Sequence, residues 1–325
     1  VTIKMNFFKL LKEIYKRLLN RFLFKRPDFS ENRIFLQGKI IIEKNKDKNK
    51  IDNLKDVEFS VFSQFGDDGI ISWVVNQIPN IKKKFVEIGT QDYWESNTRF
   101  LLKSENWSGI LVDSSEKDIR KIKQQRIYWQ HNLKAYQLMV TKENINQFLT
   151  DQISAKDKDI GLLSIDIDGN DYWILEEINS IDPTIVVCEF NSIFGDIHKI
   201  SVLYEKNFVR NNLHYSNLYF GASIKALISL MEKKGYFYIG TNSSGINAFF
   251  IKEHLSANFK TKIQEIKTFP SKVRECLDKD GKLTYENIFE RKKRIENLKI
   301  YDFDEKKVKL LNEYKTLYTN NWVES

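Results

Sequence analysis

The feature that most constrains the fold is an apolar run followed at once by closely spaced acids, in residues 161–171. The run GLLSI carries no charge and is followed by Asp166, Asp168 and Asp171 beside a glycine. A short apolar run bounded by turn residues is typical of a strand that is buried on both faces. Carboxylates at the carboxyl end of such a strand lie in the crevice where open α/β sheets bind ligands. The stretch therefore predicts a central sheet strand that leads into a functional site.

Segments of the same kind recur on both sides of this stretch and alternate with helical patterns. The further strands expected before the chain turns back cover residues 85–90, 109–113, 135–140 and 183–190. Alternation of strand and helix predicts parallel pairing with right-handed crossovers, which is a doubly wound, Rossmann-like α/β fold. Two more strands, at 236–240 and 246–251, surround a turn and predict a terminal antiparallel hairpin.

This α/β body is predicted to occupy residues 57–252, with different material at each end. Residues 1–56 hold a basic amphipathic helix and then a polar, solvated linker over 43–56. Within the body, residues 192–221 form an insertion that is long for a connection, and such insertions at strand ends tend to be lids or acceptor sites. Residues 253–325 are rich in Lys and Glu, which predicts a charged helical appendage or an oligomer contact.

The net charge of +8 lies mostly in the first part of the chain, because residues 1–26 contain eight Lys or Arg residues and a single acid. A nucleic-acid-binding protein usually carries a basic stripe on its folded domain, so this distribution argues against nucleic acid as a partner. Phe and Leu alternate with Lys at helical spacing over residues 4–26. This helix either lies on an anionic membrane surface, at the inner face of the membrane, or packs on the body or on a second subunit.

Cysteine usage indicates the compartment. The two cysteines, Cys188 and Cys276, cannot build a disulfide framework and favour a reducing environment. Cys188 lies inside an expected strand and is interpreted as a buried core residue rather than a nucleophile. No stretch reaches the roughly 20 unbroken apolar residues of a membrane span, and no cleavable signal is visible. We therefore expect a cytoplasmic protein.

A second signal is the spacing of Glu87, Gly89 and Asp113. A glycine after the first strand lets the backbone approach a cofactor, and an acid about 20 residues on can accept both ribose hydroxyls. Acids also end strands simply as helix N-caps, and that interpretation stays open for each acid taken alone. Two strand-end acids on adjacent strands together favour a nucleoside-containing cofactor.

Several segments together resemble bacterial FkbM-type, S-adenosylmethionine-dependent methyltransferase domains, especially the branch found in polysaccharide and lipopolysaccharide gene clusters. The segments are FVEIG at 85–89, NTR at 97–99, WSG at 107–109, SIDIDGND at 164–171, YFGAS at 219–223 and residues 240–250. The resemblance extends over residues 59–252. It implies the methyltransferase variant of the doubly wound fold, with S-adenosylmethionine as the cofactor.

The resemblance also implies roles for individual residues. Asp166 and Asp168 match the acidic loop that faces the methyl acceptor. The residues implied in cofactor binding are Glu87, Gly89, Asp92, Tyr93, Asn97, Asp113 and Ser114. Tyr93 occupies the place of the second glycine of the family motif. A side chain there is expected to crowd the methionine end of the cofactor, or to stack on the adenine or on a substrate.

The chemistry of the acidic loop has several interpretations. One carboxylate could orient or deprotonate a sugar hydroxyl. Asp166 and Asp168, with Glu189 from the next strand end, could hold Mg²⁺ or Mn²⁺, because hard cations choose oxygen ligands. Asp166-Ile167-Asp168 could also be the Asp-x-Asp of a metal-dependent glycosyltransferase. For Asp171, the cap of a turn is the plain alternative.

His198 and His214 are the histidines of the insertion, and either could serve as a base beside Asp166 and Asp168. A surface or hydrogen-bonded structural role is the alternative for each. The leading hypothesis is an S-adenosylmethionine-dependent O-methyltransferase that acts on a hydroxyl of a sugar or glycan precursor. The other hypotheses are the glycosyltransferase and a Rossmann-like binding protein of a glycan cluster that has lost its cofactor.

Overall fold

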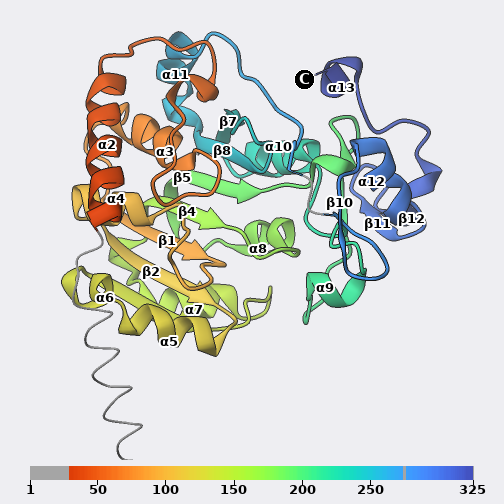
Figure 1. Cartoon of the computed structure of the whole chain (residues 1–325), viewed down its shortest axis with the longest axis horizontal. Helices are drawn as coiled ribbons and strands as arrows, with labels where there is room; N and C mark the ends of the chain where they lie inside the picture. Colours follow the sequence, from red (N-terminus) through yellow and green to blue (C-terminus); the bar gives the residue numbers. More distant parts are fainter. Residues whose placement is uncertain (1–28, 274–275, 325) are drawn as a thin grey trace, which may run out of the picture.

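The computed structural model describes residues 29–273 and 276–324, and a seven-stranded sheet forms its centre (Figure 1). The strand order is β3-β2-β1-β4-β5-β8-β7. The strands are β1 (Lys84–Ile88), β2 (Ser108–Asp113), β3 (Leu133–Gln137), β4 (Asp159–Ile165), β5 (Asp182–Glu189), β7 (Tyr236–Thr241) and β8 (Asn247–Lys252). Each strand that the sequence predicts for the main sheet is therefore present.

In the order of the sheet, the first five strands run parallel to one another, and the last two form an antiparallel hairpin. β1 lies between β2 and β4, so that Val86 is opposite Ile110 on one side and Leu163 on the other. β8 pairs antiparallel with both β5 and β7. A terminal antiparallel hairpin beside five parallel strands is the methyltransferase variant of the doubly wound fold, as the sequence predicted.

One strand has different limits from those expected. The third strand was predicted over 135–140, whereas β3 covers Leu133–Gln137. Leu133 and Ala135 are the buried residues of its alternating pattern, and both pack in the core. β3 ends at Gln137, and Leu138 donates its backbone amide to the Asp113 carbonyl at 2.9 Å and lines a cavity.

Helices cover both faces of the sheet, because successive residues of a strand point to opposite sides. In β1, Val86 packs in one core cluster and Phe85 in the other. The first cluster includes residues of α7 (Ile145–Gln152), α8 (Asp171–Glu177) and α10 (Ile224–Lys233). The second includes residues of α3 (Asp67–Asn76), α4 (Arg99–Glu105), α5 (Glu116–Gln124), α6 (Arg126–Gln130) and α11 (Ser256–Lys262).

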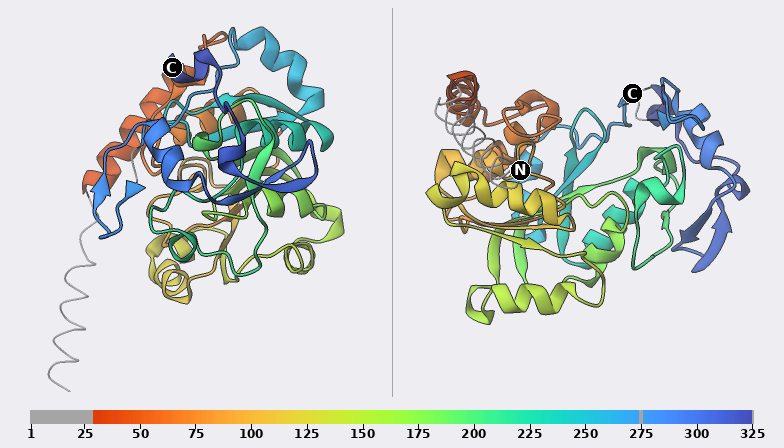
Figure 2. Two further views of the ribbon diagram at one scale, coloured as in Figure 1. Left: turned by 90° about the vertical axis from the view of Figure 1, so that its right-hand side faces the viewer. Right: turned by 60° about the horizontal axis from the view of Figure 1, so that its bottom comes forward.

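The insertion and the C-terminal part of the chain build a smaller unit together (Figure 2). β6 (Ile200–Val202) of the insertion pairs with β11 (Lys299–Asp302), and β11 also pairs with β12 (Lys307–Leu310). The other elements of this region are α9 (Arg210–Leu213), β9 (Cys276–Leu277), β10 (Leu283–Thr284), α12 (Ile288–Ile295) and α13 (Asn320–Glu324). Residues of β6, β9, α12 and β11 share a buried apolar core, whereas Trp322 of α13 packs in the first core cluster of the main sheet. The predicted charged appendage is therefore only partly helical, because its apolar residues pack on the insertion.

The predicted solvated linker over 43–56 is wrong in part. α2 (Phe29–Lys46) continues into it, and Leu54–Val57 forms the short helix η1. Ile51 and Leu54 are buried in the same core cluster as α3. Three apolar residues at 51, 54 and 57 thus anchor a segment whose polar composition suggested exposure.

The basic helix predicted over residues 4–26 lies outside the described residues. Within the described ranges, no helix is both long and apolar enough to cross a membrane. Cys188 is fully buried in the core, as the sequence predicted, and Cys276 is also buried. Both carry free thiols.

Candidate functional site

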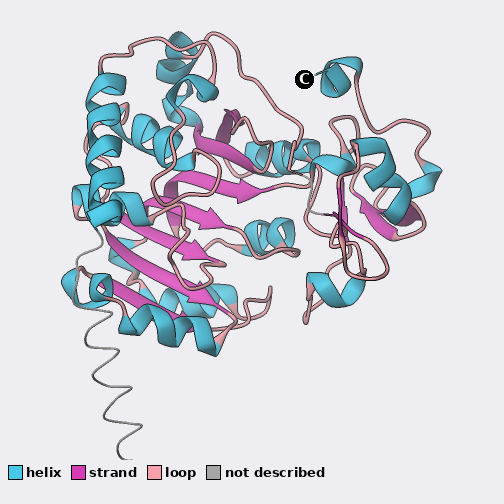
Figure 3. Cartoon of the chain, viewed as in Figure 1, coloured by secondary structure: helices cyan, strands magenta, loops and turns pink. Residues whose placement is uncertain are grey.

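The carboxyl ends of the parallel strands face the smaller unit (Figure 3). Several acids lie at that edge. Glu87 lies in β1, Asp113 ends β2 and Glu189 ends β5. Asp166 directly follows β4, and its amide donates a hydrogen bond to the carbonyl of Ile88 at 3.0 Å. The sheet therefore brings acids from four separate segments of sequence to one edge.

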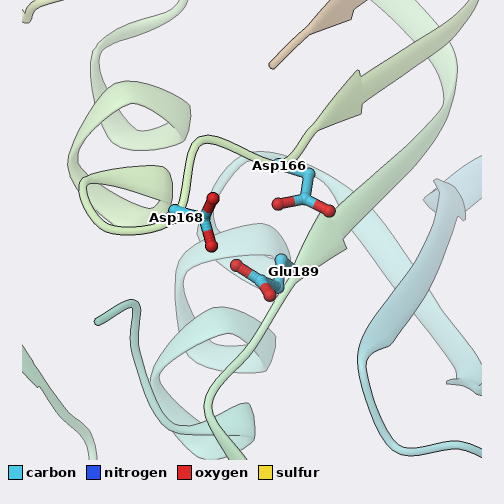
Figure 4. Close-up of side chains that lie close together, drawn as sticks. All are labelled: Asp166, Asp168 and Glu189. Carbon is cyan, nitrogen blue, oxygen red and sulfur yellow. The ribbon is translucent and has the colours of Figure 1, made fainter. Parts of the chain in front are cut away.

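Asp166, Asp168 and Glu189 form a cluster that we call the carboxylate triad (Figure 4). One carboxylate oxygen from each residue lies within 4.8 Å of those from the other two. In Figure 4 the three carboxylates turn toward a common centre, two from the loop after β4 and one from β5. Glu189 is buried, with 6% of its surface exposed, while Asp166 is half-buried and Asp168 is exposed. The structure thus brings together the three residues that the sequence grouped as metal ligands.

Asp171 holds the loop that carries the triad residue Asp168. Its carboxylate accepts hydrogen bonds from the backbone amides of Ile167 and Gly169, at 2.8 and 2.9 Å. Asp171 is fully buried, and burial raises its pKa to about 6. Asp168 adopts a φ of +56°, a conformation that Asp tolerates better than most residues. Of the two residues predicted as a helix cap, Asn170 is the N-cap of α8, whereas Asp171 is the first residue of that helix and holds the turn before it.

The triad concentrates negative charge in a partly buried place. Burial, followed by the neighbouring carboxylates, raises the pKa of both Asp166 and Glu189 well above the usual range. Arg210 of α9 forms an ion pair with Asp168, and its guanidinium lies 3.8 Å from the ring centroid of Phe220. Oε2 of Glu189 is buried and has no hydrogen-bond partner within the described part of the chain.

A cavity of about 350 Å³ lies over the triad, and we call it the carboxylate cavity. Residues of the main sheet and of the smaller unit both line it. Besides the triad, its polar lining includes Asp67, Asn97, Asn191, Arg210, Asn247 and Arg291. A concave site with many convergent polar groups suits a polar ligand that carries several hydroxyls.

A second cavity, of about 310 Å³, shares Gly89, Asp166 and Asp168 with the first, and we call it the β2 cavity. Asp113 and Ser114, from the end of β2, lie on its wall. Its apolar surface comes from Val112, Leu138, Met139, Val140, Ile167 and Phe208. The two cavities thus adjoin at the end of the central strands and differ in chemical character.

Asp113 is suited to bind hydroxyl groups in the β2 cavity. Its two carboxylate oxygens accept hydrogen bonds from the backbone amides of Gln91 and Ser115, at 2.7 and 2.8 Å. Each oxygen keeps a second lone pair for a further donor. Burial raises the pKa of Asp113. An acid beside an apolar wall is the combination that a nucleoside needs, with the acid on the ribose and the wall on the base.

Glu87 contrasts with Asp113, because both carboxylate oxygens of Glu87 accept hydrogen bonds from the loop after β1. Its carboxylate accepts hydrogen bonds from the Ser96 hydroxyl at 2.7 Å, from the Asn97 amide at 2.9 Å and from the Thr98 hydroxyl. Burial raises the pKa of Glu87. Asn97 also donates its side-chain amide to Ser164 at 3.1 Å. Both Glu87 and Asn97 line the carboxylate cavity, so they shape that cavity rather than the β2 cavity.

Gly89 is required by the close approach of two strand ends. Its φ is +87°, and a Cβ atom built there would lie 1.5 Å from the carbonyl oxygen of Asp166. Gly89 also lines both cavities. The glycine that the sequence linked to cofactor approach therefore has a structural role of its own, at the point where the cavities meet.

Tyr93 differs from the expectation. Its ring is fully buried in the core, and its hydroxyl forms a hydrogen bond with the Thr98 hydroxyl at 3.0 Å. Its φ is +65°, so the backbone keeps the left-handed conformation that a glycine adopts freely. The prediction that the ring crowds or stacks on a cofactor or substrate is wrong, because the ring lines neither cavity.

Asp92 and Ser114 have separate surroundings. The Asp92 carboxylate pairs with Lys121 at 3.2 Å and lines neither cavity. Ser114 is exposed beside Asp113 and lines the β2 cavity. Only Ser114 of these two lies where a ligand of the β2 cavity can touch its side chain.

Neither predicted histidine lies at the triad. His198 forms a hydrogen bond with the carbonyl of Thr316 at 3.0 Å and packs against the ring of Tyr314. His214 forms a hydrogen bond with the Ser216 hydroxyl at 2.7 Å, and burial lowers its pKa. Neither lines the carboxylate cavity or the β2 cavity. Their positions therefore agree with the structural alternative and not with a base beside the triad.

Asp67 is a site residue that sequence reasoning did not single out. It begins α3, and its carboxylate accepts hydrogen bonds from the side chains of Asn242 at 3.0 Å and Asn247 at 3.4 Å. It is 1% exposed, and burial raises its pKa to about 7. Its local sequence indicated a turn and nothing more. Arg210 was also missed, since the insertion shows no motif around it.

Comparisons with known proteins give distant structural matches. No family model matches the sequence, and no curated protein matches it significantly. The N-terminal domain of EvdMO1 with SAH bound has a TM-score of 0.39 and 10% identity, and the match covers 66% of this chain and 95% of that chain. The same domain in the presence of SAH and D-fucose also has a TM-score of 0.39 and 10% identity, over 70% of this chain and 99% of that one. The O-methyltransferase from Bacillus cereus in complex with SAH has a TM-score of 0.38 and 12% identity, covering 72% of this chain and 96% of that one. Because these identities and TM-scores are low, the fold is defined here by the strand order of the sheet.

Proposed function

We propose that this protein is an S-adenosylmethionine-dependent O-methyltransferase that acts on a hydroxyl of a sugar or glycan precursor. The observation that carries the proposal is the meeting of two different cavities at Gly89, Asp166 and Asp168. The β2 cavity combines an acid with an apolar wall, whereas the carboxylate cavity is polar and holds the triad. Transfer of a methyl group requires a donor and an acceptor side by side, and two adjoining cavities provide for this.

The β2 cavity would hold the cofactor. Asp113 would accept hydrogen bonds from the ribose hydroxyls, while Leu138 and Met139 would contact the adenine. When bound, S-adenosylmethionine supplies a methyl group on a positively charged sulfur. The negative charge of Asp166 and Asp168, where the cavities meet, favours a cation at that position electrostatically.

The carboxylate cavity would hold the acceptor. A hydroxyl that attacks a methyl group gives up its proton, and a carboxylate within hydrogen-bond reach can take it. Asp166 and Glu189 have raised pKa values, which makes them stronger bases than ordinary carboxylates. The side-chain oxygen of Asn247, on the same lining, is buried and has no partner among the described residues, so it can accept a hydrogen bond from a sugar hydroxyl.

The proposal extends to the setting of the reaction. Because its motifs resemble those of the FkbM-type branch found in polysaccharide clusters, we propose that the protein belongs to that branch. We also propose that it acts in the bacterial cytoplasm. The division of the chain into three parts remains a prediction from the sequence, with limits at 1–56, 57–252 and 253–325. Membrane contact through residues 4–26 and self-association also remain predictions. The insertion over 192–221 contributes Arg210 to both cavities, which supports its role on the acceptor side.

Calorimetric titration with S-adenosylhomocysteine tests the cofactor half of the proposal. We expect micromolar binding by the wild type and at least tenfold weaker binding by Asp113→Asn, a loss of about 1.4 kcal/mol or more. The matched control is Glu116→Gln, which removes one charge from an exposed side chain of α5. Equal affinity in all three proteins would remove the ribose role of Asp113.

The same titration separates the alternatives. Binding of a nucleotide sugar with Mn²⁺, but not of S-adenosylhomocysteine, would favour the metal-dependent glycosyltransferase. Binding of neither donor would favour a Rossmann-like protein that has lost its cofactor. Binding of S-adenosylhomocysteine alone supports the methyltransferase and moves the search to sugar acceptors.

A further inference from the structure

We propose that the carboxylate triad of Asp166, Asp168 and Glu189 binds one divalent cation, Mg²⁺ or Mn²⁺, at the base of the carboxylate cavity. The role of this cation in acceptor binding rests on the proposed function. Its binding is argued from the triad itself, and it can be measured without any methyl transfer.

The first argument is the placement of the ligands. One oxygen from each carboxylate lies within 4.8 Å of the other two. Two oxygens that share one Mg²⁺ at about 2.1 Å each lie at most about 4.2 Å apart, so small side-chain rotations bring the three into range. Asp166 and Glu189 stand on the ends of two paired strands, and Asp171 fixes the turn that presents Asp168. The site is therefore built on rigid elements.

The second argument is an unpartnered atom in the triad. Oε2 of Glu189 is buried and has no hydrogen-bond partner among the residues described, in a side chain that is only 6% exposed. A buried polar atom that lacks a partner costs roughly 1–3 kcal/mol. In Figure 4 the Glu189 carboxylate points toward Asp166 and Asp168, so a cation held between the three carboxylates would give this oxygen a partner.

The third argument is the balance of charge. A bound cation would keep all three carboxylates ionised, with three negative charges, and Arg210 supplies one positive charge through its pair with Asp168. Two negative charges remain in excess, which is the charge that a divalent cation neutralises. Arg210 contacts Oδ1 of Asp168 and packs on Phe220.

The ligand types decide the class of cation. The group consists of oxygen ligands and contains neither His nor Cys, which favours Mg²⁺ or Mn²⁺ over Zn²⁺. Three protein ligands leave coordination positions that face the carboxylate cavity. An acceptor hydroxyl bound there would have a lowered pKa, which is the activation that O-methylation of a sugar requires.

Mn²⁺ titration of the full chain, by calorimetry and by electron paramagnetic resonance, tests the proposal. We expect one Mn²⁺ per chain, and at least tenfold weaker binding by Glu189→Gln, which keeps the shape of the side chain. Asp168→Asn, at an exposed position, is a second variant in case the first fails to fold. Asp159→Asn is the matched control, because Asp159 is an exposed carboxylate at the opposite end of β4.

Each outcome bears on the proposal. No Mn²⁺ binding by the wild type up to about 10 mM, or equal binding by Glu189→Gln and Asp159→Asn, would overturn it. Mn²⁺ binding without S-adenosylhomocysteine binding would support the cation site while it contradicts the proposed function. If the chain binds S-adenosylhomocysteine but does not bind Mn²⁺, the cation site is overturned and the proposed function is not.

Discussion

Glu189 and Asn247 are opposite each other in the antiparallel pair of β5 and β8, and each has one buried side-chain oxygen without a hydrogen-bond partner in the described chain. Side chains of directly opposed residues lie on the same face of a sheet. Both residues line the carboxylate cavity. Because buried polar atoms in folded proteins nearly always have partners, these two oxygens indicate where a ligand completes the bonding.

Arg210 is expected to compete with a cation for the triad. It pairs with Asp168 and brings a positive charge close to the proposed site, which weakens cation binding by repulsion. Arg210→Gln is therefore expected to raise the affinity for Mn²⁺ severalfold in calorimetry. The control is Arg120→Gln on α5, whose charge is exposed and pairs with Glu116. Weaker Mn²⁺ binding by Arg210→Gln would show that Arg210 supports the site instead.

Asp67 is expected to make folding stability depend on pH. Burial raises its pKa from the ordinary value of 3.8 to about 7, so the folded chain binds this proton more tightly than the unfolded chain. The resulting stabilisation is fully present below about pH 4 and is lost as the pH rises to about 7.

Asp67→Asn isolates this effect, since Asn cannot ionise but can still accept a hydrogen bond from Asn242. Between pH 5 and pH 8, the free energy of unfolding in urea should fall by on the order of 1–3 kcal/mol more for the wild type than for the variant. Asp159→Asn, at an exposed position, serves as the control and should follow the wild type. Parallel curves for the wild type and Asp67→Asn would show that Asp67 has an ordinary pKa.

Gly89 is expected to tolerate no side chain. A Cβ atom at Gly89 would meet the Asp166 carbonyl oxygen at 1.5 Å, whereas one at Gly235 would meet nothing within 4 Å. Both glycines have positive φ, at +87° and +82°, so Ala at either position carries similar backbone strain of about 1–2 kcal/mol. We expect urea unfolding to show Gly89→Ala less stable than Gly235→Ala by about 3 kcal/mol or more. Equal losses would mean that the strand ends can separate without cost.

Tyr93 is expected to affect stability and not cofactor binding. Tyr93→Phe removes the hydrogen bond to Thr98 at 3.0 Å while the ring stays in the core. The free energy of unfolding should fall by about 1 kcal/mol. The affinity for S-adenosylhomocysteine should stay within twofold of the wild type. A tenfold weaker affinity would place the ring near the cofactor after all.

The main sheet was predictable because its signals are local. The parallel strands β1, β2, β4 and β5 are short apolar runs that end near an acid or a glycine, and strand-helix alternation implies the crossovers. Parallel strands end at one edge, so Asp113, Asp166 and Glu189 were expected there before any coordinates were known. Their grouping follows from topology rather than from sequence distance.

The rest of the site depends on contacts that sequence spacing does not record. Asp67 meets Asn247 across a sequence separation of 180 residues, and β6 meets β11 with Tyr301 opposite Ser201. The direction of the Tyr93 side chain was also unpredictable, because Tyr93 takes the place of a motif glycine beside the expected cofactor while its ring turns into the core. Arg210 reaches Asp168 through the fold of an insertion that has no recognisable pattern.

A crystal structure of the chain grown with S-adenosylhomocysteine and Mn²⁺ tests the account most directly. The account predicts the ribose of the cofactor product against Asp113, its adenine in the β2 cavity, and an anomalous Mn²⁺ peak between Asp166, Asp168 and Glu189. A nucleoside bound elsewhere, or no nucleoside in crystals soaked at millimolar concentration, would contradict the central claim of a methyltransferase site.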